Sequence, residues 1–339
     1  MRVLLIKPKH IGDSLLLTPT IVAIRRDYPA AEIWVVVRRG CEEILAGCPE
    51  IDRLLTVAPV DQSERRAGDG WAGLKTAARL FGAKFDYVFE LGDGHRARFL
   101  ARLPRASQRY SVRPTDARAV QAALKSGLTI SNFAWENRHR VEKDFYTVAE
   151  FLPLAQPIPP VRFARECARE WAPAAGLGSF AVMQIGKRQD AGRWTREGWA
   201  EVGRWLLQRV DNIVIASGSA PSEVAEATWL RERLGAPCLA TLGKADWPEL
   251  AGLLYRAKLY VGLDTAATHL AAACQCPAVV LFGATLEENW RPWQSPHRIV
   301  AQAADNPRER TMAAIKPDEV IAACDGLFNV GAVYDRPTF

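Results

Sequence analysis

The chain alternates short apolar runs with longer helix-type segments, and this alternation is the feature that most constrains its fold. Residues 3–7 are apolar up to the closing lysine, which is typical of a strand buried on both faces of a sheet. Further strands in the first half are expected at residues 33–37, 54–57, 87–91 and 109–112, and helices at or near 12–23, 41–46, 71–81, 97–102 and 141–152. Strands that alternate with helices predict a doubly wound parallel sheet of the α/β class.

The alternation restarts after a proline cluster at residues 153–160, which is the predicted linker. Strands are then expected at residues 180–185, 213–217, 238–242, 257–262 and 278–282, and helices at 196–209, 221–234, 247–256, 265–273 and 317–328. The chain therefore divides into a Rossmann-like domain (1–160), a second such domain (161–315) and a C-terminal helix and tail (316–339). We expect this last segment to pack back on the first domain, and ligands to bind at the carboxyl ends of the strands, in a cleft between the domains.

The composition is that of a folded, soluble protein. Of 339 residues, 49% are hydrophobic and 24% are charged, and no apolar run approaches the roughly 20 residues that span a bilayer. The N-terminus lacks the features of a signal peptide, so we expect a cytoplasmic protein. The seven cysteines have no metal-site spacing, which predicts reduced, mostly buried thiols and no metal centre.

The net charge of +6 is unevenly distributed. Residues 96–118 hold seven arginines, including Arg96 and Arg98, and a single acid, Asp116. Such a basic face attracts nucleic acid, an anionic membrane surface or a phosphorylated substrate. No nucleic-acid motif accompanies it, so no nucleic-acid partner is expected. The alternative is an arginine-rich helix that merely faces water.

The turn after the first strand places a carboxylate at the start of a helix. It reads Lys7-Pro-Lys-His-Ile-Gly-Asp-Ser14, in which Gly12 allows a tight turn and Asp13 follows. Asp13 could act as a general base toward a hydroxyl. The alternative is that Asp13, or Ser14 in its place, caps the helix. One glycine is too few for a dinucleotide fingerprint, which disfavours hydride transfer.

A second polar corner lies at residues 261–273, where a strand leads through Asp264 and Thr265 into an alanine-rich helix that carries His269. Unpaired backbone N–H groups at such a helix start suit the phosphates of a nucleotide or sugar nucleotide. The alternative is an Asp-Thr cap that satisfies the same donors without a ligand.

Other candidate binding residues follow neighbouring strands of the second half. Lys187, Arg188 and Arg193 lie on one loop and suit a diphosphate, unless that loop only faces water. Glu223 could accept hydrogen bonds from a ribose or a base, or simply favour the start of its helix. Trp290 and Trp293 could stack on a base or sugar, or close a core edge.

Together these residues resemble the heptosyltransferase family of lipopolysaccharide biosynthesis, glycosyltransferase family 9. The opening residues 1–19 with the Gly12-Asp13 turn, and residues 261–269 followed by 277–283, match the family's two signatures. Residues 85–91, His139-Arg-Val-Glu142 and Trp194 with Trp199 also fit, so the likeness covers nearly the whole chain. The loop at residues 289–293 is most similar to the branch that adds the third heptose of the inner core.

The resemblance implies a GT-B fold and an inverting, metal-independent transfer from ADP-L-glycero-β-D-manno-heptose to a phosphorylated lipopolysaccharide inner core, without a cofactor. It makes Asp13 the catalytic base. The donor-binding residues that it implies are Lys187, Arg188, Arg193, Glu223, Asp264, Thr265, Ala266, Ala267 and His269, and the acceptor-binding residues are His10, Gly12, Arg96 and Arg98. It further implies a monomer in peripheral contact with the cytoplasmic face of the inner membrane.

The sequence departs from the family pattern at two positions. Gly192 stands where the family usually has a lysine, so Arg193, Lys187 or Arg188 would have to supply that charge. Ala266 stands where many relatives have glycine, and its methyl group leaves less room for a phosphate to come close to the backbone. The rival functions are a family transferase with another sugar or acceptor, a sugar-nucleotide epimerase, and a nucleotide-sugar-binding protein that has lost its chemistry.

Overall fold

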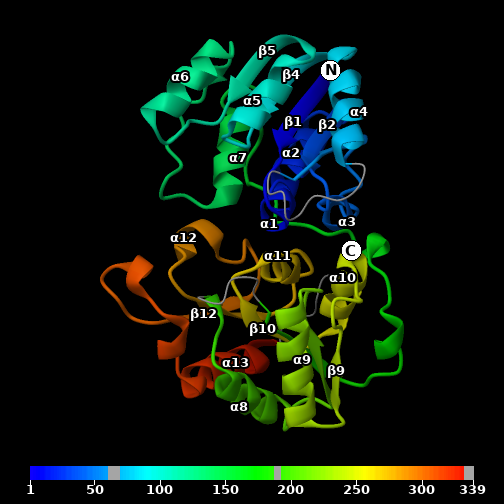
Figure 1. Ribbon diagram of the computed structural model, residues 1–339, viewed down its shortest axis with the longest axis vertical. Coiled ribbons are helices and arrows are strands. Elements are labelled where there is room, and N and C mark those ends of the chain that lie inside the picture. Colours follow the sequence, from blue (N-terminus) through cyan, green and yellow to red (C-terminus); the bar gives the residue numbers. More distant parts are fainter. Residues whose placement is uncertain (60–68, 187–191, 332–339) are drawn as a thin grey trace. The chain divides into compact units, whose positions relative to one another are not determined.

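The computed structural model describes residues 1–59, 69–186 and 192–331. The chain forms two compact units, Met1–Val161 and Arg162–Phe339, and each has its own parallel sheet (Figure 1). The doubly wound α/β class is therefore confirmed for both halves of the chain.

The first unit is built on a six-stranded sheet in the order β3-β2-β1-β4-β5-β6. All of its pairings are parallel. The strands are β1 (Arg2–Lys7), β2 (Glu32–Arg38), β3 (Arg53–Val57), β4 (Lys84–Glu90), β5 (Arg105–Ser111) and β6 (Thr129–Ile130). The order reverses between β1 and β4, so the carboxyl ends of these two strands flank the topological switch point, where open α/β sheets bind ligands.

Helices cover both faces of this sheet. They are α1 (Ile11–Leu15), α2 (Thr18–Asp27), α3 (Glu42–Leu45), α4 (Asp69–Phe81), α5 (His95–Arg102), α6 (Ala117–Lys125) and α7 (Arg140–Ala149). From β3 onward the chain crosses the sheet in the direction opposite to its first crossings, so right-handed connections place α4, α5 and α6 on one face. Leu80 of α4 and Leu100 of α5 pack there against Leu4 and Ile6 of β1, while α2 and α7 pack against each other.

The second unit repeats the architecture with a six-stranded sheet in the order β12-β11-β10-β7-β8-β9, again parallel throughout. The strands are β7 (Phe180–Gln184), β8 (Asn212–Ala216), β9 (Cys238–Ala240), β10 (Leu259–Leu263), β11 (Ala278–Phe282) and β12 (His297–Ala301). The helices are α8 (Arg196–Leu206), α9 (Pro221–Leu234), α10 (Trp247–Arg256), α11 (Ala266–Ala273), α12 (Glu287–Trp290) and α13 (Pro317–Gly331). Here the switch point lies between β7 and β10.

The structure differs from the sequence-based expectation in a few elements. The helix expected over residues 12–23 is two helices, since the chain turns at Leu16 and Leu17 between α1 and α2. Four elements were not predicted, namely α6, β6, α12 and β12. They are short or lack a clear apolar period: β6 has two residues, and the edge strand β12 begins with His297 and Arg298.

The last helix does not match the expectation that it packs back on the first domain. α13 lies against α8, β10, β11 and β12 of the second unit. Val320 and Cys324 are fully buried in that unit's core, and Phe328 packs edge-on against Trp205 of α8, with ring centroids 5.9 Å apart. The apolar side of α13 is thus used within the second unit.

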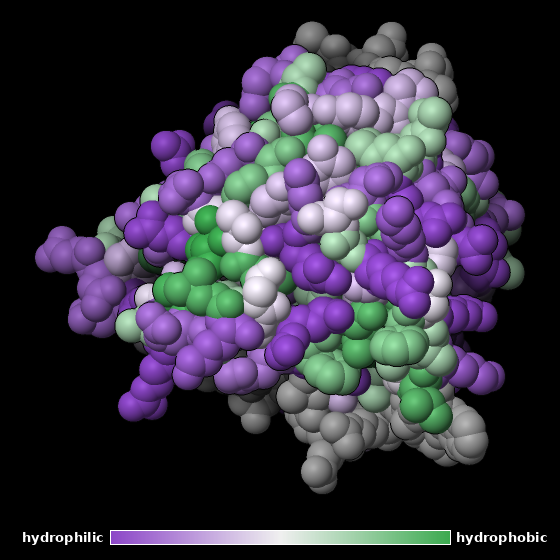
Figure 2. Space-filling view, turned by 90° about the horizontal axis from the view of Figure 1, so that it is seen from above, coloured by the Kyte–Doolittle hydropathy of each residue, from purple (hydrophilic) through white to green (hydrophobic). Residues whose placement is uncertain are grey.

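The surface is largely hydrophilic with smaller hydrophobic patches, as Figure 2 shows for one side of the molecule. Among the described residues, no helix combines the length and the apolar character needed to cross a membrane. Six of the seven cysteines are buried.

The close packing of α10 against the backbone of Arg169, near the start of the second unit, gives a test of the fold. A methyl group on Gly252 would stand 2.0 Å from the backbone oxygen of Arg169, and no side-chain movement relieves a clash with backbone. We expect Gly252→Ala to lower the free energy of unfolding by about 1–3 kcal/mol, measured by urea denaturation.

The matched control is Gly326→Ala in α13, where an added methyl group would meet nothing within 4 Å. Alanine is the better helix former, so this variant should be unchanged or more stable by about 0.5–1 kcal/mol. Equal effects of the two substitutions would contradict the packing of α10.

Candidate functional site

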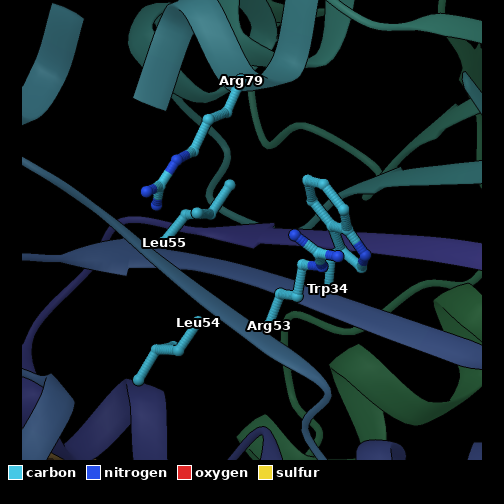
Figure 3. Close-up of a pocket in the computed structure, with 5 residues that line it drawn as sticks. All are labelled: Trp34, Arg53, Leu54, Leu55 and Arg79. Atoms are coloured by element: carbon cyan, nitrogen blue, oxygen red, sulfur yellow. The ribbon is translucent and has the colours of Figure 1, made fainter. Parts of the chain in front are cut away.

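The cavity in Figure 3 lies at the amino-terminal end of the first sheet, whereas ligands of such sheets bind at the carboxyl ends of the strands. Its volume is about 310 Å³, and it is lined by Trp34, Arg53, Leu54, Leu55 and Arg79. The Arg53 guanidinium lies 4.8 Å from the Trp34 ring centroid. Because Arg53 begins β3 and Trp34 lies early in β2, this hollow belongs to the amino-terminal end of the sheet. The polar clusters at the carboxyl ends are the better candidates.

A capping box starts α7 and thereby directs its polar side chains. His139 Nδ1 accepts a hydrogen bond from the Val141 amide at 3.2 Å, and Glu142 accepts one from the His139 amide at 3.0 Å. The family-like His139…Glu142 pair therefore has a local role as a helix start. Arg140, Lys143 and Asp144 are spaced i, i+3 and i+4, so they share one face of the helix.

That face brings buried charges to the end of β1. Lys7 forms an ion pair with Asp144, and the two side chains are only 3% and 0% exposed. The Lys143 ammonium and the Arg140 guanidinium lie 3.8 Å and 4.6 Å from the centroid of the Trp135 ring, positions that favour cation–π attraction. The indole N–H of Trp135 donates to the Arg113 carbonyl at 2.7 Å, which fixes the ring. This set, Lys7, Trp135, Arg140, Lys143 and Asp144, is called the α7 charge cluster below.

Burial governs the ionisation of the cluster. It lowers the pKa of Lys143 to about 8, while the neighbouring Asp144 acts in the opposite direction. Burial also raises the pKa of Asp144. The ammonium group of Lys7 acts in the opposite direction, because it stabilises the carboxylate. The pKa of Arg140 is lowered by burial, and Asp13 and Asp144 both oppose that change.

Asp13 therefore belongs electrostatically to this cluster. It lies in the first turn of α1, directly after β1, and is partly exposed. The N-cap position belongs to His10 and no side chain caps the helix, so neither Asp13 nor Ser14 has the capping role considered as the alternative. Ser14 instead donates to the His10 carbonyl at 3.2 Å. A partly exposed carboxylate near the half-buried Arg140 guanidinium can accept a proton from a bound hydroxyl.

A second polar group follows β4 on the other side of the switch point. Buried Glu90 accepts hydrogen bonds from Ser111 Oγ at 2.7 Å and from the Gly92 amide at 2.9 Å, and burial raises its pKa. Arg98 pairs with Asp93 at 2.9 Å and is 3% exposed. Gly92 is required here, because a methyl group would lie 2.8 Å from the Ala97 Cβ and 3.0 Å from the Pro8 Cδ. The loops after β1 and β4 are thus packed together.

The basic segment at residues 96–118 does not form a single basic face. Arg98 is buried, and Arg109 donates to the carbonyls of Ala101, Pro104 and Ala106 at 3.2, 2.6 and 3.3 Å, which is a structural role. Arg96 stands at the carboxyl end of the sheet, where it donates to the Ala58 carbonyl. His10, Gly12, Asp13, Arg96 and Arg98 thus all belong to loops or helix starts at that end, whereas Arg102 and Arg105 belong to the opposite end.

In the second unit the switch point between β7 and β10 is joined by a hydrogen bond between side chains. Thr265 Oγ1 donates to Gln184 Oε1 at 3.0 Å. Thr265 holds the N-cap position of α11, but its side chain makes no capping bond. The described residues therefore provide no side-chain cap for the first amides of α11, those of Ala266 and Ala267. That arrangement differs from the Asp-Thr cap and suits an anion.

Asp264 and His269 flank this helix start. The Asp264 amide donates to the Leu281 carbonyl at 3.3 Å, which fixes the corner between β10 and α11. His269 is 3% exposed, and its ring centroid lies 6.2 Å from that of Trp290, whose ring is tilted by 38°. Trp290 thus packs beside the buried histidine.

Glu223 lies in the first turn of α9, and its carboxylate reaches two neighbouring loops. The carboxylate lies so close to Gly186 and Gly218 that a methyl group added at either glycine would stand 2.6 Å or 2.5 Å, respectively, from one of its oxygens. Arg193 donates to Ser222 Oγ at 2.7 Å, which brings a cation to the same helix start. Lys187 and Arg188, also predicted to bind the donor, lie outside the described residues.

Several polar residues at these edges were not recognised from the sequence as site residues. They are Lys7, Trp135, Arg140, Lys143, Asp144 and Gln184. The spacing of the α7 residues places them on one face, but the partner of Asp144 lies 137 positions away. Gln184 could have been recognised from the sequence, because it is a polar residue at the carboxyl end of an otherwise apolar strand.

Two doubly wound parallel sheets, each with polar groups at its switch point, are the fold of a GT-B glycosyltransferase. Residues 74–317 match the model of glycosyltransferase family 9 (heptosyltransferase). Because this match covers well over half of the chain, the protein belongs to that family.

The chain is similar to curated heptosyltransferases and to solved structures along most of its length, as three examples illustrate. It is 28% identical to lipopolysaccharide heptosyltransferase 3 of Escherichia coli, over 93% of this chain and 96% of the relative. It is 27% identical to lipopolysaccharide heptosyltransferase 1 of Pseudomonas aeruginosa, over 84% and 79%. The structure of E. coli heptosyltransferase WaaC with ADP superposes with a TM-score of 0.79 at 21% identity, covering 96% of this chain and 100% of the other.

The α7 charge cluster predicts a specific dependence of stability on alkaline pH. The pKa of Lys143 falls from 10.5 to about 8 on folding, so between these values the unfolded chain holds a proton that the folded chain has released. The free energy of unfolding then rises with pH across this window. Relative to Lys143→Met, the wild-type protein should gain up to about 3 kcal/mol between pH 8 and pH 10.5, measured by denaturation at a series of pH values.

The control is Lys244→Met, at an exposed lysine of the second unit. Its difference from wild type should stay constant over the same range. A constant difference for Lys143→Met as well would contradict the buried position of this ammonium group.

Proposed function

We propose that this protein is an inverting glycosyltransferase of lipopolysaccharide core biosynthesis that transfers L-glycero-D-manno-heptose from ADP-heptose to an inner-core hydroxyl. In the proposed step the acceptor oxygen attacks the anomeric carbon and loses its proton to the Asp13 carboxylate. The bond between the anomeric carbon and the β-phosphate oxygen breaks, and ADP leaves with the electron pair.

The observation that carries this proposal is the environment of Asp13. The carboxylate is partly exposed at the switch point of its sheet, and it interacts electrostatically with Arg140 and with Asp144 of the buried Lys7–Asp144 pair. A general base must be reachable by the acceptor hydroxyl, and a partly exposed carboxylate at the end of β1 meets that requirement, while the buried Lys7–Asp144 pair holds α7 beside β1. His10, Gly12, Arg96 and Arg98 belong to the same end of the sheet, and we assign the acceptor to this end.

The donor is assigned to the second unit. The amides at the start of α11 and Arg193 would meet the charge of the diphosphate, and the proposal therefore needs no metal ion or cofactor. Glu223, between Gly186 and Gly218, would accept hydrogen bonds from the nucleoside. Arg193, Lys187 or Arg188 would replace the lysine missing at Gly192, and of these three Arg193 lies within the part of the chain that the structure describes. His269 and Asp264 complete the donor end.

The relatives favour one branch of the family for the acceptor. Two E. coli relatives that are each 28% identical are both lipopolysaccharide heptosyltransferase 3. A solved E. coli heptosyltransferase carries ADP-2-deoxy-2-fluoro heptose, which supports the choice of donor. We further propose that the protein acts as a monomer at the cytoplasmic face of the inner membrane.

Asp13→Asn tests the base directly. It removes the proton acceptor but keeps the size of the side chain, so kcat should fall by about 10²–10⁴-fold while ADP-heptose binding is retained. Initial rates and calorimetric donor titrations measure the two quantities. Asp116→Asn, which keeps a helix cap on α6, is the control and should keep normal turnover. Normal turnover in Asp13→Asn would eliminate Asp13 as the base.

Gly218→Ala tests the donor end. The new methyl group would displace the flexible Glu223 carboxylate at little cost to the fold, so donor affinity should fall by about 10-fold with unchanged melting behaviour. Gly176→Ala, where an added methyl group would meet nothing within 4 Å, should bind the donor normally. Unaltered affinity in Gly218→Ala would remove Glu223 from the donor site.

A further inference from the structure

Three helices form one outer surface of the first unit. The right-handed connections after β3, β4 and β5 place α4, α5 and α6 on the same face of the sheet. Leu80 of α4 and Ala97 and Leu100 of α5 bury the inner sides of these two helices in one core cluster, which Leu128, just after α6, also joins. The outward side of the three helices is called the α4–α6 surface.

Exposed large hydrophobic side chains are concentrated on this surface. Leu74, Phe81, Phe99 and Leu124 are 61%, 72%, 59% and 52% exposed. Among the described residues, the remaining large hydrophobic side chain with comparable exposure is that of Met1, at 41%. Single exposed apolar residues are ordinary, but four on adjacent helices and none in the described part of the second unit require an explanation.

Cationic residues lie between these side chains. Lys75, Arg79, Arg102, Arg118 and Lys125 are exposed on the same helices. From Gly73 to Phe81, and throughout α5 and α6, the sequence contains no acidic residue. The nearby Asp116 is used as the N-cap of α6, where it accepts from the Ala119 amide at 2.8 Å. From Gly73 to the end of α4, and along α5 and α6, protruding aromatic and aliphatic groups are therefore combined with charge of a single sign.

The arrangement follows the helical period. On α4, Leu74 and Phe81 are seven residues apart and lie on one side, with Lys75 and Arg79 beside them. On α5, Phe99 and Arg102 are three apart. Helices that lie in a membrane interface present apolar side chains flanked by lysine and arginine in this way.

We propose that the α4–α6 surface docks the protein on an anionic phospholipid bilayer. The Phe and Leu side chains enter the boundary between headgroups and acyl chains, and the lysine and arginine side chains contact lipid phosphates. Charge complementarity selects this occupant, because lysine and arginine side chains are attracted to the negative surface potential of a membrane, at about 1 kcal/mol per residue. The surface is distinct from the transfer site and does not depend on the proposed chemistry.

The test is co-sedimentation of the full chain with vesicles, comparing mixed phosphatidylethanolamine–phosphatidylglycerol vesicles with phosphatidylcholine vesicles. Wild-type protein should bind the anionic vesicles, less strongly as salt rises, and should not bind the neutral ones. Lys75→Glu/Arg79→Glu/Arg102→Glu should weaken the partition coefficient on the order of 100-fold. Phe81→Ser/Phe99→Ser should weaken it by about 10-fold or more with no change of charge.

The matched control, Arg204→Glu/Arg233→Glu/Lys258→Glu, makes the same charge change at exposed residues of the second unit, and should bind within about 2-fold of wild type. Circular dichroism confirms that each variant is folded. Equal losses in the control and the α4–α6 charge variant would overturn the proposal in favour of general electrostatic attraction. Wild-type protein that ignores anionic vesicles, or that sediments as a dimer which Phe81→Ser/Phe99→Ser dissociates, would also overturn it.

Discussion

Parallel pairing of the strands is the constraint on which the rest of the structure depends. Because every pairing is parallel, the carboxyl ends of all strands in a sheet meet at one edge, and the chain leaves that edge as loops that open into helices. Each sheet also reverses its order once, between β1 and β4 and between β7 and β10. At these two places neighbouring loops run to opposite faces, and side chains and amides that are distant in the chain are brought together.

The two switch points have different electrostatic characters. In the first unit, side-chain charges dominate: Lys7 pairs with Asp144 in the interior, Lys143 and Arg140 lie over Trp135, and Arg140 also interacts electrostatically with Asp13. In the second unit, the amides of α11 without a side-chain cap and the pair Thr265–Gln184 dominate. The first arrangement suits proton transfer to a carboxylate, and the second suits an anionic leaving group. This division supports the proposed roles of the two units in glycosyl transfer.

The strand–helix alternation predicted most of the fold, because buried parallel strands are apolar on both faces and stand out in a sequence. Elements without that signature were missed, as the two-residue β6 and the polar edge strand β12 illustrate. The turns with Asp13 and Thr265 were recognised because their residues are adjacent. The Lys7–Asp144 pair was not, because it joins residues whose proximity arises only when α7 packs beside β1. Arg98 was assigned to the acceptor from its place in the basic segment, and sequence alone does not reveal that its side chain is buried and paired with Asp93.

The central claim is that this chain transfers a heptosyl group rather than epimerising or merely binding a sugar nucleotide. The most direct measurement incubates the purified protein with ADP-L-glycero-β-D-manno-heptose, with and without truncated inner-core acceptors, and identifies the products by mass spectrometry and NMR. We expect ADP and an α-linked heptosylated acceptor, formed only when an acceptor is present. An altered sugar nucleotide formed without an acceptor, or no reaction with any heptose-bearing core, would contradict it.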